Sequence, residues 1–130
     1  MLSAADQLRE LEARLVRTGG ILAPDTLAEP DEFDESAFFE AVMTFHTGHR
    51  LHIGLVIDLD AGYPIWERYR FHLLGPDGRG VFRYDNESHY PAMSTFPHHK
   101  HVGPDETPVE SHQPTLAQIV AEVRAAVQAE

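Results

Sequence analysis

The stretch Arg50–Leu59, RLHIGLVIDL, decides the fold of this chain of 130 residues. Every second residue in it is apolar, which is typical of a β-strand with one buried face, because successive side chains of a strand point to opposite sides. The buried face is predicted to hold Leu51, Ile53, Leu55, Ile57 and Leu59. The opposite face is predicted to hold Arg50, His52, Gly54, Val56 and Asp58.

Three further strands are predicted around this one. They are Ala37–His46, Ile65–Leu74 and Gly80–Asp85, and the turns between them are Thr47-Gly48, Asp60–Pro64 and Gly75–Gly78. Short connections favour antiparallel neighbours, so we expect a four-stranded antiparallel meander. On its third strand we expect Ile65, Tyr69, Phe71 and Leu73 to oppose Trp66, Arg68, Arg70 and His72.

A helix is predicted at each end of the chain. Ser3–Thr18 has an N-cap serine and helical apolar spacing, and Gly19-Gly20 ends it. Ile21–Glu35 is expected to be an acidic loop with little regular structure. A second amphipathic helix is predicted from Pro114 to about Ala129. The fold class is α+β in two layers, and residues 1–130 are predicted to form one domain, with the first helix either on the core or apart from it on the loop.

Composition sets the class of protein. A hydrophobic content of 42% and 24% charged residues fit a soluble globular chain. The absence of cysteine excludes disulfides and thiolate chemistry. Neither a signal peptide nor an apolar run of about 20 residues is found, so we expect a cytoplasmic protein that does not span a membrane.

The formal net charge of -11 is unevenly distributed. Residues 66–101 carry five Lys/Arg and four Asp/Glu, whereas the rest of the chain carries five and seventeen. A strongly acidic chain is a poor non-specific binder of nucleic acid. The near-neutral middle leaves a local RNA or DNA site open, and the acidic flanks are equally suited to a basic partner protein.

The functional centre is predicted in Phe82–His101, FRYDNESHYPAMSTFPHHKH, which holds four of the nine histidines. Histidine is costly to bury without a partner, so the cluster is expected at the surface. Two chemistries fit it. In the first, His99 and His101 point to one side of an extended segment and bind a divalent metal, with Asp85 or His89 completing the shell.

The second chemistry is metal-independent acid–base cleavage of RNA. Histidines near their usual pKa of about 6.5 exchange protons at neutral pH, and a neighbouring cation stabilises the charge at phosphorus. The predicted catalytic residues are His98, His99, Lys100, His101, Tyr84 and Asp85. Solvated histidines that bind only an anion or a partner remain the simpler alternative.

A cationic surface is predicted on the polar face of the sheet. Its members are Arg50, His52, Arg68, Arg70 and His72, with Arg83 beside them and Trp66 available for stacking. Such a row can hold phosphates. The alternative is that these arginines pair with Glu40, Asp58 and other acids of the same sheet.

Arg83-Tyr84-Asp85-Asn86, followed by Phe96-Pro97-His98-His99-Lys100-His101, resembles the TumE-like toxins of bacterial and archaeal toxin–antitoxin modules. The resemblance covers about Phe38–Val127, within a family-like core of residues 36–130. Where the family often has a proline and paired histidines, Glu87–Tyr90 keeps only His89.

The resemblance implies a small cytoplasmic toxin with a cognate helix-turn-helix antitoxin. RNA or another nucleic acid is then the expected target, with nuclease action as the expected reaction. The alternative function is a non-catalytic module that binds a metal or a partner. Both a monomer and a homo-oligomer fit the sequence.

Overall fold

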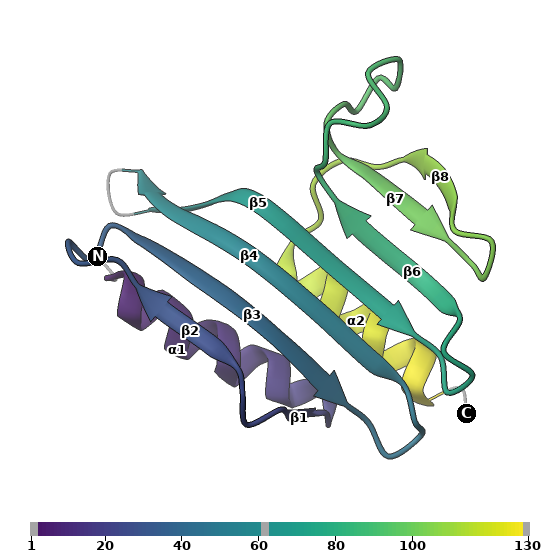
Figure 1. Ribbon diagram of the computed structural model, residues 1–130, viewed down its shortest axis with the longest axis horizontal. Helices are drawn as coiled ribbons and strands as arrows, with labels where there is room; N and C mark the ends of the chain where they lie inside the picture. The colour runs from purple at the N-terminus through teal and green to yellow at the C-terminus, as the bar shows by residue number, and fades with distance from the viewer. Residues whose placement is uncertain (1–2, 61–62, 129–130) are drawn as a thin grey trace.

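The computed structural model describes residues 3–60 and 63–128. Eight strands form one antiparallel sheet, and both helices lie on the same side of it (Figure 1). The helices are α1 (Ala4–Leu15), which a short 3-10 turn η1 (Val16–Thr18) extends, and α2 (Leu116–Gln128). The strands are β1 (Ile21–Leu22), β2 (Leu27–Pro30), β3 (Ser36–Thr44), β4 (Arg50–Asp60), β5 (Tyr63–Leu74), β6 (Gly80–Asp85), β7 (His99–Val102) and β8 (Thr107–Glu110).

The sheet follows the order β1-β3-β4-β5-β6-β7-β8. β2 pairs with the same edge of β3 as β1 does, at a different part of that strand. The α+β class with two helices is therefore confirmed, whereas the four-stranded meander is not, because the sheet has eight strands. The four predicted strands correspond to β3–β6 and are all antiparallel to their neighbours. No helix in the described residues is long and apolar enough to cross a membrane.

The expected acidic loop contains two short edge strands. β1 and β2 pair with successive parts of β3, from Ile21 opposite Thr44 to Pro30 opposite Ala37. Proline is tolerated on an edge strand because an outward-facing N–H is not needed there. The prediction of little regular structure in Ile21–Glu35 is wrong, since pairing with β3 outweighs the local turn signals.

Two further strands, β7 and β8, lie outside the predicted meander. β7 pairs with β6 and β8 pairs with β7. Residue propensities do not indicate these strands, because each is only four residues long and they contain proline and histidine. Most of their stability comes from the neighbouring strand.

Bulges set the faces of the sheet. The predicted alternation of β4 is observed, with Leu51, Ile53, Leu55 and Ile57 buried. In β5 the register shifts opposite Val56/Ile57, so Trp66 pairs with Ile57 and packs against the core. Trp66 was expected on the polar face. A bulge leaves one residue unpaired and thereby reverses the alternation beyond it.

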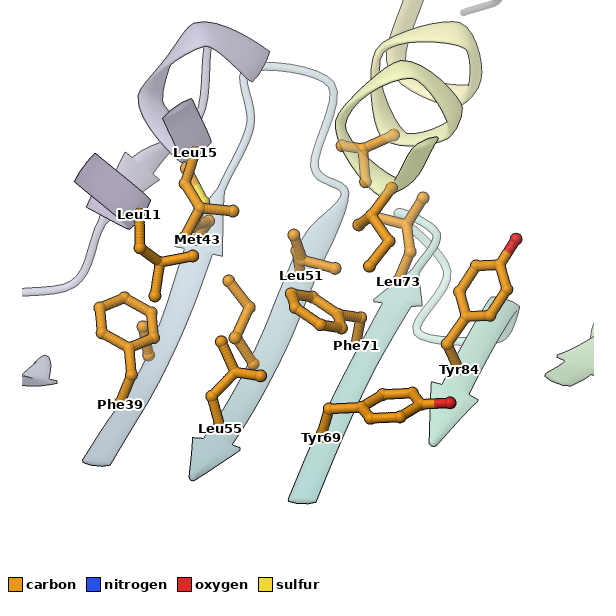
Figure 2. Close-up of a cluster of buried hydrophobic side chains, with 14 of the residues drawn as sticks. Leu11, Leu15, Phe39, Met43, Leu51, Leu55, Tyr69, Phe71, Leu73 and Tyr84 are labelled. Atoms are coloured by element: carbon orange, nitrogen blue, oxygen red, sulfur yellow. The ribbon is translucent and has the colours of Figure 1, made fainter. Parts of the chain in front are cut away.

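The core lies between the sheet and the helices (Figure 2). α1 contributes Leu8, Leu11 and Leu15, and α2 contributes Ile119, Val123 and Val127. The first helix thus packs on the common core rather than apart from it. Ser3 and Asp6 form the capping box of α1, and Gly19, with a φ of 88°, ends the turn that follows it.

The second helix begins two residues after the predicted Pro114. Thr115 caps it, because its hydroxyl accepts from the Gln118 N–H while the Gln118 side chain accepts from the Thr115 N–H. Ala129, its predicted end, lies outside the described residues, as do Ala61 and Gly62 of the predicted turn.

Candidate functional site

The pairing of β6 with β7 brings the two histidine-region motifs side by side. Arg83 lies opposite His101, Tyr84 opposite Lys100 and Asp85 opposite His99. Cross-strand partners share a face of the sheet, and successive residues alternate between faces. The motifs are therefore divided between the helix face, which carries the core, and the outer face, which is turned away from the helices.

The outer face holds a histidine–aspartate cluster, formed by Asp85, His99 and His101. Each of the three offers a ligand atom within 4.8 Å of the others. His99 Nε2 lies 2.8 Å from Asp85 Oδ1, and His101 Nε2 lies 3.9 Å from Asp85 Oδ2. The three residues are only 1–5% exposed. The expectation that His99 and His101 lie at the surface is therefore wrong, while their placement on one side of the strand is confirmed.

Burial of these rings is possible because the backbone satisfies one nitrogen of each. His99 Nδ1 lies 3.0 Å from the Pro97 carbonyl oxygen, and His101 Nδ1 lies 2.9 Å from that of Glu106. The Tyr90 ring packs edge-on against both, with centroid distances of 5.0 Å and 5.9 Å. A polar group with a partner can be buried at modest cost, which the sequence alone does not reveal.

Arg83 borders the cluster. Its Nε donates to Asp85 Oδ2 at 3.1 Å, and its Nη2 donates to His101 Nε2 at 3.0 Å. Nη1 lies 3.7 Å from Glu106 Oε1. The guanidinium therefore compensates the buried carboxylate, while the Arg83 side chain keeps 27% of its surface exposed.

Tyr84 and Lys100 face the helices instead. The Tyr84 hydroxyl donates to Glu122 Oε1 at 2.6 Å, and Lys100 Nζ donates to Glu122 Oε2 at 2.7 Å. Figure 2 shows the Tyr84 ring on the same side of the sheet as the core side chains. Burial lowers the pKa of Lys100, but the hydrogen bonds with Glu122 and Tyr84 outweigh it and raise the pKa overall. Burial and the bond to Glu122 raise the pKa of Tyr84.

Asn86 and His98 attach the motifs to β5. The Asn86 side chain accepts from the Tyr69 N–H at 3.0 Å and donates to the Glu67 carbonyl at 2.9 Å, so it bonds the backbone across the bulge. His98 Nδ1 lies 3.0 Å from the Tyr69 hydroxyl, and the two rings stack. Burial, followed by the charges of His112 and His99, lowers the pKa of His98.

The predicted cationic surface lies on the outer face beside the cluster. One row across the sheet runs His52–His72–Arg83–His101, and the next runs Glu40–Gly54–Arg70–Asp85–His99. Neighbouring strands are about 5 Å apart. Arg70 is therefore the direct neighbour of Asp85, and His72 is that of Arg83.

Acids neutralise part of this surface, though Glu40 and Asp58 form none of the ion pairs found among the described residues. Arg68 lies 3.6 Å from Glu87, and His72 Nε2 lies 3.1 Å from Glu106 Oε1. Arg50 and Arg70 form no salt bridge with any residue of 3–60 or 63–128. The surface is thus mixed in charge, and within the described residues Arg50 and Arg70 have no carboxylate partner.

Two histidines of this surface are biased toward the neutral form. Burial, followed by the charges of Arg50 and Arg70, lowers the pKa of His52. Burial is also the main cause of the lowered pKa of His72, where Arg83 adds to it and Glu106 opposes it. A neutral ring beside arginines can accept a proton at neutral pH.

A hollow of about 440 Å³ opens on the outer face next to Arg70. Its lining includes Phe38, Glu40, Gly54, Val56, Arg68 and Arg70. A Cβ added at Gly54 would meet no atom within 4 Å, so the glycine leaves open space in mid-strand. The hollow has the size of a small-ligand site and begins one strand from the cluster.

The structure brings together Arg83, Asp85, His99 and His101, with Arg50, Arg68, Arg70 and His72 on the adjoining surface. Tyr84 and Lys100 are turned to the other face, so the motif does not form one connected surface. His89 is exposed and does not join the cluster. Sequence reasoning missed Glu106 and Glu122, because nothing in their local pattern indicates that each lies beside the motif.

Comparison with known proteins gives one finding. A family model described as Toxin TumE matches residues 12–129. This range begins before the resemblance seen in the sequence and takes in the end of α1 and both edge strands. No curated protein and no solved structure matches the chain significantly.

Proposed function

The chain belongs to the TumE toxin family, and on that premise we propose that it acts on RNA through the outer face of its sheet. The cationic surface binds phosphates, and the adjoining histidine–aspartate cluster marks the reaction centre. Membership of a toxin family implies a cognate antitoxin. We propose that this partner is a helix-turn-helix protein.

The observation that carries the proposal is the neighbourhood of Arg70 and Asp85. The two are cross-strand partners, and the hollow over Gly54 lies on the other side of Arg70. An RNA phosphate on Arg70 would therefore have a nucleotide-sized space on one side and the cluster on the other. Phosphate contacts position a nucleic acid, and the groups beside them act on it.

The proposed reaction is cleavage of the RNA chain at a phosphodiester. His72 Nδ1 takes the proton of a 2′-hydroxyl, because His72 Nε2 is buried against Glu106, and the 2′-oxygen attacks the phosphorus. The bond from phosphorus to the 5′-oxygen breaks, and that oxygen takes a proton from water. The lowered pKa of His72 keeps its ring neutral for this step, and Arg70 and Arg83 stabilise the charge that develops at phosphorus.

The test uses purified, tag-free protein and single-stranded RNA. Arg70→Ala is expected to weaken RNA binding and to reduce the salt dependence of log K by about one phosphate contact. The matched control is Arg124→Ala, which removes an exposed arginine from α2. Equal RNA affinity for wild type and the Arg70 variant would contradict the proposal.

A non-catalytic binding module is the second candidate, and the burial of the cluster favours it. In this alternative the three residues, which are 1–5% exposed, only hold β6 and β7 together. Under this alternative the protein binds RNA or a protein partner but leaves RNA intact. Cleavage by wild type that His72→Gln abolishes would exclude it.

A further inference from the structure

We infer that Asp85, His99 and His101 bind one divalent transition-metal ion, with zinc as the best fit to the donor set. The binding itself does not depend on the proposed function. Only the use of the ion in RNA cleavage rests on it.

The hydrogen bonds of the rings fix which nitrogens are free. A backbone carbonyl can only accept, so Nδ1 of His99 and Nδ1 of His101 carry the hydrogens that point to Pro97 and Glu106. In the neutral rings both Nε2 atoms therefore present lone pairs, and both lie toward Asp85. Histidines that bind metals donate their other ring N–H in the same manner, which orients the ring and sets its tautomer.

The contact of His99 with Asp85 would be stabilised by a cation between the two side chains. Nε2 lies 2.8 Å from Oδ1, yet it is a buried atom without a hydrogen-bond partner in the described part of the chain, because the contact lacks the alignment of a hydrogen bond. Two lone-pair-bearing atoms at this separation repel in the neutral tautomer. Ligands about 2.0–2.1 Å from a tetrahedral zinc ion lie roughly 3.3 Å apart, so a small adjustment would suit both atoms.

The donor set selects the ion. Two imidazoles and one carboxylate suit zinc and its first-row neighbours better than magnesium or calcium, which prefer oxygen ligands. Three protein ligands also leave a position for water or substrate, as in catalytic rather than structural zinc sites. The Tyr90 ring shields one side of the imidazoles.

Arg83 competes with the ion for the same atoms. Its guanidinium donates to His101 Nε2 and to Asp85 Oδ2, and the single lone pair of His101 Nε2 cannot serve the arginine and a metal at once. Arg83 is partly exposed and lies near Glu106, toward which it can turn. Metal binding is therefore predicted to displace Arg83 from the cluster.

This competition gives a test, because removal of Arg83 should raise the Zn²⁺ affinity if the cluster binds metal. A cluster that serves only as a structural hydrogen-bond network would show no such rise. Tag-free protein is first treated with chelator, and Zn²⁺ and Co²⁺ binding are then measured by calorimetry and by the visible absorption of Co²⁺. We expect one ion per chain and a higher melting temperature with Zn²⁺, because the ion binds only the native chain. Arg83→Gln is expected to bind Zn²⁺ more tightly than wild type.

His101→Gln is expected to weaken Zn²⁺ binding at least about tenfold, and His89→Ala, the matched histidine outside the cluster, is expected to bind like wild type. If His101→Gln fails to fold, wild type and the Arg83 variant still decide. The absence of stoichiometric binding by wild type, or unchanged or weaker binding by a folded Arg83→Gln, would overturn the inference. RNA binding measured in chelator is a separate readout, so failure of the metal site and failure of the proposed function are distinguishable.

Discussion

The two faces of the β6–β7 pair contain alternate residues of the same short motifs and have opposite characters. On the helix face, Tyr84 and Lys100 both donate to one carboxylate of α2, that of Glu122. On the outer face, Asp85, His99 and His101 gather ligand atoms that the hydrogen bonds only partly satisfy. The comparison teaches that a run of chemically active residues in a strand is two sets, and that only one of them lies on the face where we propose that RNA binds.

The largest expected effect contrasts adjacent residues of β4. Leu55 is 3% exposed, and Leu55→Asp is predicted to lower the free energy of unfolding by about 3–5 kcal/mol, because it buries an unpaired charge. Val56 belongs to the outer face beside Arg68, so Val56→Asp is predicted to cost less than about 1 kcal/mol. Urea unfolding of both variants measures the difference, and equal losses would mean that the faces are wrongly assigned.

The next effect separates stability from activity on the helix face. Glu122→Ala leaves Tyr84 and Lys100 without their acceptor and is predicted to lower the free energy of unfolding by about 1–3 kcal/mol. RNA cleavage at a temperature where the variant is folded is expected to stay near the wild-type rate. Arg124→Ala on the same helix is the control for an exposed change. A folded Glu122 variant without cleavage would place α2 in the reaction.

The smallest expected effect is the pH dependence of stability that two histidines of the outer face cause. His52 and His72 have folded pKa values below the ordinary 6.5, so below that pH the unfolded chain takes up protons more readily. Their contribution to stability is present above about pH 6.5 and is lost as the pH falls toward the folded values. The urea midpoint of wild type is expected to fall between pH 7 and pH 5.

The double variant His52→Gln, His72→Gln is expected to show a smaller fall over the same range. His112→Gln, a change at an exposed histidine, is the control. A profile of the same slope in the double variant and in wild type would show that other groups cause the pH dependence.

Much of the sheet could be predicted because β4 and its neighbours alternate in sequence as they do in space. Leu51 through Ile57 alternate in the structure as in the prediction, and β6 has the predicted bounds. β7 and β8 were not predicted, because their short lengths, prolines and histidines give no strand pattern and their stability comes from pairing with β6 and with each other. The bulge that turns Trp66 into the core is likewise a property of two strands together.

The candidate site was predicted in part. That His99 and His101 share a face follows from spacing, since residues two apart in a strand share a face. The prediction left Asp85 and His89 open as the third member, and the register of β6 on β7 places Asp85 beside the two rings. Their burial did not follow, because the carbonyls of Pro97 and Glu106 that satisfy the rings cannot be read as partners from the sequence. The separation of Tyr84 and Lys100 from the cluster required the register of β6 on β7.

The central claim is that the helix face of the β6–β7 pair stabilises the fold and the outer face acts on RNA. Substitution of two adjacent residues of β7 tests this claim most directly. RNA cleavage and the urea midpoint would be measured for Lys100→Met, on the helix face, and His101→Gln, on the outer face. The account predicts a Lys100 variant of lower stability that cleaves RNA at nearly the wild-type rate. It predicts that cleavage by a folded His101 variant falls at least about tenfold, because His101 Nε2 accepts the hydrogen bond that holds Arg83 beside the reacting phosphate. Undiminished cleavage by folded His101→Gln, or an equal loss in both folded variants, would contradict it.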